Sequence, residues 1–116
     1  MKTLILENEN NLNIQFKVKW AKNLWQRLVG LLATPILNKN EGLLLSPCCS
    51  IHTMGMRYAL DLVFMDRDGR VLKCVSGLKP YRTASAKFAY YTLELPTGTI
   101  NEMGVVVGNR FTWSTN

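Results

Sequence analysis

Two apolar runs joined by four turn-forming residues constrain the fold of this chain more than any other feature. The runs Leu60–Met65 and Arg70–Val75 are largely apolar, and the sequence Asp-Arg-Asp-Gly lies between them. The carboxylate of Asp66 can accept hydrogen bonds from backbone amides further along such a turn, and Gly69 can adopt the left-handed conformation that side chains disfavour. The pattern therefore predicts a β-hairpin with antiparallel strands.

Several other segments have the pattern of β-strands. Residues 12–19 alternate apolar and polar side chains at every step, which predicts a half-buried strand. Its buried face would carry Leu12, Ile14, Phe16 and Val18. Thr3–Leu6 should pair with this strand across the polar turn at 7–11. Further strands are predicted at 42–45, which is apolar on both faces and therefore central, at 89–95 and at 105–113.

Two short helices are predicted between these strands. The first begins at Asn23, because leucines follow at helical spacing and asparagine can cap the first turn. The second begins at Thr99, because Thr99 and Glu102 have the spacing of a capping box, in which each side chain bonds the other residue's backbone amide. Gly104 would end this helix. The polar segment 77–87 is predicted to be a loop.

The order of these elements predicts a mainly β fold of the α+β class, with about six strands and one or two short helices. Strands that follow one another directly favour a small antiparallel barrel or a strongly curled sheet, which hides its edges. The 116 residues fit one domain, and 47% of them are hydrophobic, enough for a core without disulfides or metal. We therefore expect a single β-rich domain over residues 1–116.

The N-terminal apolar run does not have the length of a targeting segment. It stops at Glu7, whereas the apolar region of a secretory signal has about 7–15 residues. No other stretch approaches the roughly 20 apolar residues that cross a bilayer. We expect a cytoplasmic protein with no transmembrane segment. Its three cysteines, Cys48, Cys49 and Cys74, are an odd number, which favours reduced thiols.

The chain is basic, with a formal net charge of +6. Such a charge favours contact with anions, whether acidic proteins, lipid headgroups or nucleic acid. The lysines and arginines are scattered from Lys2 to Arg110, and they form neither a compact basic run nor an aromatic-interleaved RNA-binding signature. A nucleic-acid-binding basic β domain is therefore an alternative and not the expected function.

Two cysteines and the single histidine lie within five consecutive positions, Cys48 to His52. A structural zinc site needs four ligands, which usually come from two places in the chain, and only one such cluster is present. Adjacent side chains in an extended backbone also point to opposite faces, so Cys48 and Cys49 would not share a site. We therefore expect neither a metal nor another cofactor.

The same cluster allows an enzymatic alternative. Cys48 could act as a nucleophile with His52 as its base and Asp61 orienting the imidazole, or the three could assist a metal-dependent hydrolase. The nucleophile-elbow and cysteine-protease signatures are missing, however. We therefore expect a domain without enzymatic activity, with no catalytic residue assigned.

Several motifs resemble the bacterial and archaeal family catalogued as domain of unknown function 192. They are "RLVGLL" at 27–32, "EGLLLSPC" at 41–48, "IHTMGMRYALDLVFMDRDGRVL" at 51–72, "LELPTGTI" at 93–100 and "GVVVGN" at 104–109. The chain resembles the branch with a PC-SIHT-GM-LD motif. The resemblance implies a small β-rich domain and no established activity. It also places His52 opposite a tryptophan of many relatives, which implies a packing role and no role as metal ligand or base.

We expect the loop at 47–61 and the loop at 80–82 to frame a cleft, because a rigid scaffold presents its binding residues on loops. The predicted ligand-binding residues are His52, Arg57, Asp61 and Arg82. The ligand would be a peptide, a protein or a small anion, and the protein would be a binding or accessory domain.

Two carboxylates, Asp61 and Glu94, each lie between two leucines. Strand alternation turns both carboxylates away from the leucine face, where they would either be solvated or line one cleft together. If they meet, Arg57 or Arg82 would be the counter-ion.

Overall fold

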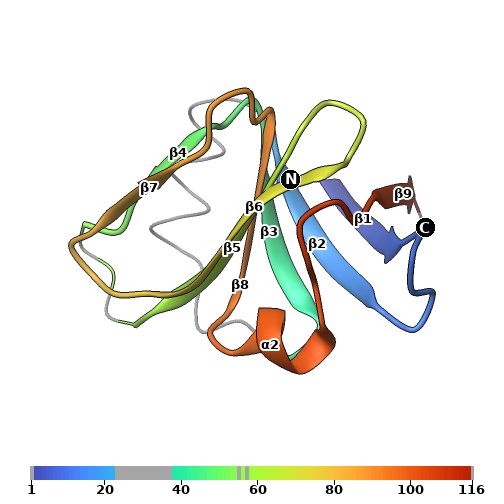
Figure 1. Ribbon diagram of the computed structural model, residues 1–116, viewed down its shortest axis with the longest axis horizontal. Coiled ribbons are helices and arrows are strands. Elements are labelled where there is room, and N and C mark those ends of the chain that lie inside the picture. The colour runs from blue at the N-terminus through green and yellow to red at the C-terminus, as the bar shows by residue number, and fades with distance from the viewer. Residues whose placement is uncertain (1, 23–37, 55, 57, 116) are drawn as a thin grey trace.

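The computed structural model describes residues 2–22, 38–54, 56 and 58–115, and its elements are labelled as in Figure 1. The strands of the main sheet are β1 (Lys2–Asn8), β2 (Gln15–Ala21), β3 (Glu41–Leu45), β5 (Leu60–Met65), β6 (Val71–Leu78), β8 (Tyr91–Pro96) and β9 (Phe111–Thr115). A separate two-stranded ribbon consists of β4 (Ser50–His52) and β7 (Thr83–Ser85). The helix α2 spans Thr99–Met103.

The main sheet curls until its two edge strands meet at one end. Its strand order is β6-β5-β8-β3-β2-β1-β9, and only the β2–β3 pair among these neighbours is parallel. At the meeting point Arg70 and Arg110 form an antiparallel bridge, and the amide of Phe111 donates to the carbonyl of Gly69 at 2.9 Å. The predicted mainly β, strongly curled sheet is therefore confirmed.

The hairpin between β5 and β6 forms by the predicted turn chemistry. Oδ1 of Asp66 accepts hydrogen bonds from the amides of Asp68 at 2.9 Å and Arg70 at 3.0 Å. Gly69 is left-handed with φ of 83°, and a Cβ on it would lie 2.2 Å from the carbonyl oxygen of Phe111. A glycine is therefore required both by the turn and by the closure of the sheet.

The N-terminal hairpin is confirmed with one error. β1 and β2 pair antiparallel, with Leu6 opposite Phe16. The predicted burial of Leu12 is wrong, because its side chain is 68% exposed. β2 begins only at Gln15, and Leu12 lies in the turn that the amide of Asn8 closes by donating to the carbonyl of Ile14.

Three further expectations need correction. Within the predicted loop 77–87, β6 continues to Leu78 and Thr83–Ser85 forms β7. The capping box at Thr99 is wrong, because Gly98 is the N-cap without a side-chain bond, and the Thr99 hydroxyl donates to the carbonyl of Pro96 at 2.7 Å. In the predicted strand 105–113, strand structure begins only at Phe111. The helix predicted from Asn23 lies outside the described residues.

Both faces of the main sheet are covered by apolar side chains. The first hydrophobic cluster contains Leu4, Leu6, Phe16, Val18, Leu44, Val63, Leu93, Leu95 and Phe111, together with Ile100 of α2. The second contains Leu43, Leu45, Leu62 and Phe64, packed with Cys48, Ile51 and Ala86 from the ribbon side. Successive residues of the central strands β3, β5 and β8 therefore alternate between two interiors, and neither of their faces is left to solvent.

Candidate functional site

One buried threonine holds the ribbon and the loop before β7 in place. The amide of Thr53 donates to the carbonyl of Arg82 at 2.9 Å, and its own carbonyl accepts from the amide of Tyr81 at 3.0 Å. Its hydroxyl accepts from the amide of Arg82 at 2.8 Å and donates to the carbonyl of Lys79 at 2.7 Å. Because these bonds come from one fully buried residue, the loop at 79–82 is fixed against the end of β4.

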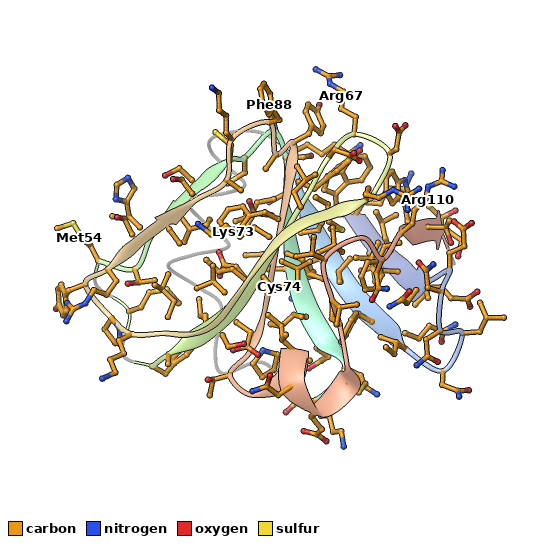
Figure 2. All side chains as sticks on the ribbon, in the orientation of Figure 1. Met54, Arg67, Lys73, Cys74, Phe88 and Arg110 are labelled. Carbon is orange, nitrogen blue, oxygen red and sulfur yellow. The ribbon has the colours of Figure 1, made fainter. Side chains whose placement is uncertain are left out.

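One end of the ribbon carries two of the four predicted ligand-binding residues. His52 lies opposite Thr83 in the β4–β7 register and Arg82 directly precedes Thr83, so their backbones are adjacent, and both side chains are exposed. Met54 and Tyr81 at the same end of the ribbon are 72% and 67% exposed. Figure 2 shows Met54 at the outer end of the ribbon, far from Arg110. This end, with His52, Met54, Tyr81 and Arg82, is called the ribbon tip below.

The other two predicted residues do not join the described part of this surface. Arg57 lies outside the described residues. Asp61 is completely buried on β5, where Oδ1 accepts from the amide of Gly77 at 2.8 Å and Oδ2 from the amide of Ile100 at 2.9 Å. Both carboxylate oxygens therefore tie β6 and α2 to the centre of the sheet, and Asp61 acts as a structural link.

The segments around the ribbon contain no acidic residue. Residues 42–60 and 69–93 together hold six lysines and arginines, the histidine, and no aspartate or glutamate. The exposed acids of the described chain, such as Glu9, Asp68 and Glu102, lie outside these two segments. Along the sequence, the segments that contain β4, β6 and β7 are therefore basic and free of acids.

A shallow hollow lies at the other end of the ribbon. Its volume is about 300 Å³, and it is lined by Pro47, Cys48, Cys49, Ser50 and Ala89. Cys48 is buried and its thiol contacts the carbonyl oxygen of Ser50 at 3.3 Å, whereas Cys49 is exposed. The two adjacent thiols therefore face different surroundings.

The enzymatic alternative finds no assembled centre in the described structure. Cys48 packs in the second cluster, His52 is exposed on the ribbon, and Asp61 bonds only to backbone amides. Within the described ranges, no three histidine, cysteine, aspartate or glutamate side chains gather as metal ligands would. No described helix has the length and apolar character that crossing a bilayer requires.

Glu94 is the residue whose environment the sequence did not indicate. It lies in the middle of β8 and is 3% exposed, and its register partners are Leu43 on β3 and Leu62 on β5. Asp61 instead pairs with Leu95, so the two carboxylates point to opposite faces of the sheet. Neither expectation for this pair is met, since neither carboxylate is solvated and they share no cleft.

The Glu94 carboxylate lacks a complete set of hydrogen bonds. Its Oε2 atom is buried and has no hydrogen-bond partner among the residues that the structure describes. Burial raises the pKa of Glu94 from 4.5 to about 7. Burial and, to a smaller extent, the charge of Glu94 also raise the pKa of the partly buried Tyr58. The feature that could have identified Glu94 as a buried acid is the position of a carboxylate within the otherwise apolar run of a predicted central strand.

The chain resembles proteins from bacteria and archaea over almost its whole length. A family model described as DUF192, Uncharacterized ACR, COG1430, matches residues 5–113. The UPF0127 protein PF1050 of Pyrococcus furiosus is 30% identical over 109 residues, which cover 87% of this chain and 90% of that protein.

Two solved structures share the fold. One is a candidate transcription regulator from Sinorhizobium meliloti 1021, with a TM-score of 0.84 and 21% identity over 97% of this chain and 94% of that chain. The other is a protein of unknown function from Novosphingobium aromaticivorans DSM 12444, with a TM-score of 0.81 and 19% identity over 96% of this chain and 84% of that chain. At these identities the likeness concerns the fold alone.

Proposed function

This chain belongs to the DUF192 family of uncharacterized proteins, and we propose that it is a non-enzymatic binding domain that holds an acidic peptide segment of a partner protein at its ribbon tip. The observation that carries the proposal is the fixation of the tip by Thr53. Four hydrogen bonds of this residue set the backbone from which Tyr81 and Arg82 extend. A surface that is ordered before binding loses less entropy when the ligand arrives.

The charges around the tip favour an acidic ligand. His52 and Arg82 are both exposed at this end of the ribbon, and Lys79 is exposed in the same loop as Arg82. The absence of acids from residues 42–60 and 69–93 means that these cations have no competing carboxylate within their own segments. An acidic peptide would therefore be attracted at long range and could form an Arg–carboxylate pair on contact.

The tip also offers apolar contacts and a strand edge that no described strand occupies. Met54 and Tyr81 are exposed, and methionine and tyrosine both suit adaptable binding surfaces. No described strand pairs with the outer edge of β4. Because Cys49 and Thr53 direct their backbone groups to β7, His52 directs its own to the outer edge, where an extended peptide could add as a strand.

The proposal can be tested with an array of acidic peptides that each carry one aromatic or aliphatic residue, and with the same peptides carrying lysine in place of aspartate and glutamate. We expect saturable binding of members of the acidic set only. In fluorescence anisotropy, Arg82→Ala and His52→Ala should each weaken the best binder about tenfold without changing the melting temperature, since both side chains are exposed.

Arg110→Ala is the matched control, because Arg110 is a basic residue far from the tip (Figure 2) and should leave binding unchanged. The proposal would be contradicted if the Arg82→Ala and His52→Ala variants bound the acidic peptide as tightly as the wild-type protein does. It would also be contradicted if the lysine peptides bound as tightly as the acidic peptides. A single-stranded oligonucleotide of similar charge serves as a second ligand. Tighter, steeply salt-dependent binding of the oligonucleotide would assign the basic surface to nucleic acid instead.

A further inference from the structure

Glu94 occupies a position where an apolar residue would be expected. The strand β8 lies between β3 and β5, and the side chains beside Glu94 on its face are Leu43 and Leu62. Both leucines belong to the second hydrophobic cluster and are almost completely buried. A leucine at position 94 would complete this face without any unsatisfied polar atom, so the carboxylate needs an explanation other than packing.

The described groups around Glu94 leave its Oε2 atom unsatisfied. On β8 itself, the inward-facing Thr92 gives its hydroxyl to the carbonyl of Cys48 at 2.9 Å. The neighbours on β3 and β5 are apolar, and Asp61 faces the opposite side of the sheet. Tyr58 is the described titratable group that senses the charge of Glu94. The ion pairs found among the described residues involve Glu9 and Glu102 and not Glu94.

An unsatisfied acceptor at a buried carboxylate calls for a donor that carries positive charge. A neutral donor would satisfy Oε2 but would leave the ionised carboxylate in an apolar setting, which is strongly unfavourable. An ammonium or guanidinium group would supply both the N–H donor and the opposite charge. The charge of Glu94 contributes to the raised pKa of Tyr58, after burial, and the Tyr58 side chain is only partly buried.

We propose that Glu94 is the anchoring acid of a second binding site, which takes the ammonium or guanidinium group of a ligand and has Tyr58 at its rim. The site is independent of the ribbon tip and has the opposite charge preference. A cationic ligand binds the ionised carboxylate, so binding displaces the proton that burial otherwise favours. The affinity for a cation should therefore rise with pH through about 7 and level off above it.

The test uses n-butylammonium as the probe and n-butanol as its neutral match, with the full chain labelled at its leucine methyl groups. Leu43 and Leu62 flank Glu94, so their methyl signals in NMR spectra report directly on the site. We expect saturable shifts of these signals with n-butylammonium and none with n-butanol. Binding should be about tenfold tighter at pH 8 than at pH 6, because the ionised fraction of Glu94 changes by about that factor.

Two variants separate the site from general effects of the probe. Glu94→Gln keeps the shape of the side chain and should abolish the shifts, while Glu102→Gln removes an exposed carboxylate on α2 and should leave them unchanged. The proposal is overturned if the wild-type protein shows no saturable shift, or if n-butanol gives the same shifts. It is also overturned if the affinity of the wild-type protein for n-butylammonium does not depend on pH. This measurement does not require that any variant folds.

Discussion

Asp61 and Glu94 make an instructive comparison, because they are buried carboxylates on adjacent strands with opposite fates. The β5–β6 pairing shifts its register between Leu60 and Leu62, and this irregularity frees the amide of Gly77 for Asp61, while the first turn of α2 supplies the amide of Ile100. Glu94 lies where the pairing with both neighbouring strands is regular. Regular ladders use their amides for the sheet and leave none for a side chain, so burial alone does not tell whether a carboxylate is satisfied.

The largest loss of stability is expected when the Asp61 carboxylate is removed. Asp61→Ala leaves the amides of Gly77 and Ile100 without their acceptor, and it detaches α2 from β5. We expect a loss of about 4 kcal/mol in the free energy of unfolding, since each buried unsatisfied amide costs roughly 1–3 kcal/mol. Urea denaturation measures this loss.

Asp61→Asn is the graded control. Its amide oxygen can still accept from one of the two backbone N–H groups, but its NH₂ group would face the other, so the loss should be intermediate. A loss below about 1 kcal/mol for Asp61→Ala would show that the two bonds do not hold these elements together.

The second largest effect concerns the pH dependence that Glu94 imposes. Its pKa is raised from 4.5 to about 7 in the folded protein, so the folded state retains a proton that the unfolded state has lost. The destabilisation is therefore absent below about pH 4.5, grows between pH 4.5 and 7, and is constant above, where it amounts to on the order of 3 kcal/mol. Unfolding measured across this range should show stability falling as pH rises.

Glu94→Gln removes the titrating group and should flatten this part of the pH profile. The contribution of other groups would remain, so the profile of the variant subtracted from that of the wild type isolates Glu94. An identical slope in both proteins would mean that the Glu94 carboxyl titrates as an ordinary exposed glutamate does.

A smaller loss of stability is expected when Thr53 is replaced. Like Asp61, Thr53 is a buried polar residue whose side chain has hydrogen-bond partners, but it lies outside the main sheet. Thr53→Val keeps the shape of the side chain and removes the acceptor of the Arg82 amide. We expect a loss of about 1–2 kcal/mol and faster hydrogen exchange of that amide, with the amides of the main sheet unaffected. Equally fast exchange throughout the sheet would show that the ribbon and the sheet unfold together.

The smallest effect should follow from an exposed carboxylate. Glu9 pairs with Arg110 at 3.1 Å, and their side chains are 51% and 39% exposed. Glu9→Gln should change the free energy of unfolding by less than about 0.5 kcal/mol, because solvent screens such pairs. Thermal unfolding at low and high salt measures this change. A change above about 1 kcal/mol would show that the exposed pair stabilises the fold as strongly as a buried carboxylate does.

Local chemistry explains which parts of the fold could be predicted from the sequence. The turn at Asp66–Gly69 contains its own hydrogen-bond acceptor and its own left-handed glycine, so the hairpin could be identified without its partners. The strand β7 has only three residues and pairs with β4 about thirty positions earlier, so nothing local marks it as a strand. The burial pattern around Leu12 was misjudged because alternation does not show where a turn ends.

The candidate site likewise has features that the local sequence determines and features that depend on distant residues. His52 and Arg82 could be selected as loop residues of suitable chemistry, but their placement at one end of the ribbon depends on the bonds of Thr53, which no local pattern reveals. Asp61 and Glu94 could be assigned to strand faces by alternation. The sequence did not show that both faces of the sheet are covered, and that fact turns two apparently outward carboxylates into buried ones.

The pairing of β1 with β9 determines how the molecule responds to tension. The strands are antiparallel, with Leu4 opposite Thr115 and Asn8 opposite Phe111. A force pulling Lys2 and Thr115 apart would therefore meet the hydrogen bonds of this pair one after another and peel the strands open. Handles at Gln15 and Leu45 would instead shear the parallel β2–β3 pair, whose bonds would have to break together. The same sheet is thus mechanically weak along one direction and resistant along another.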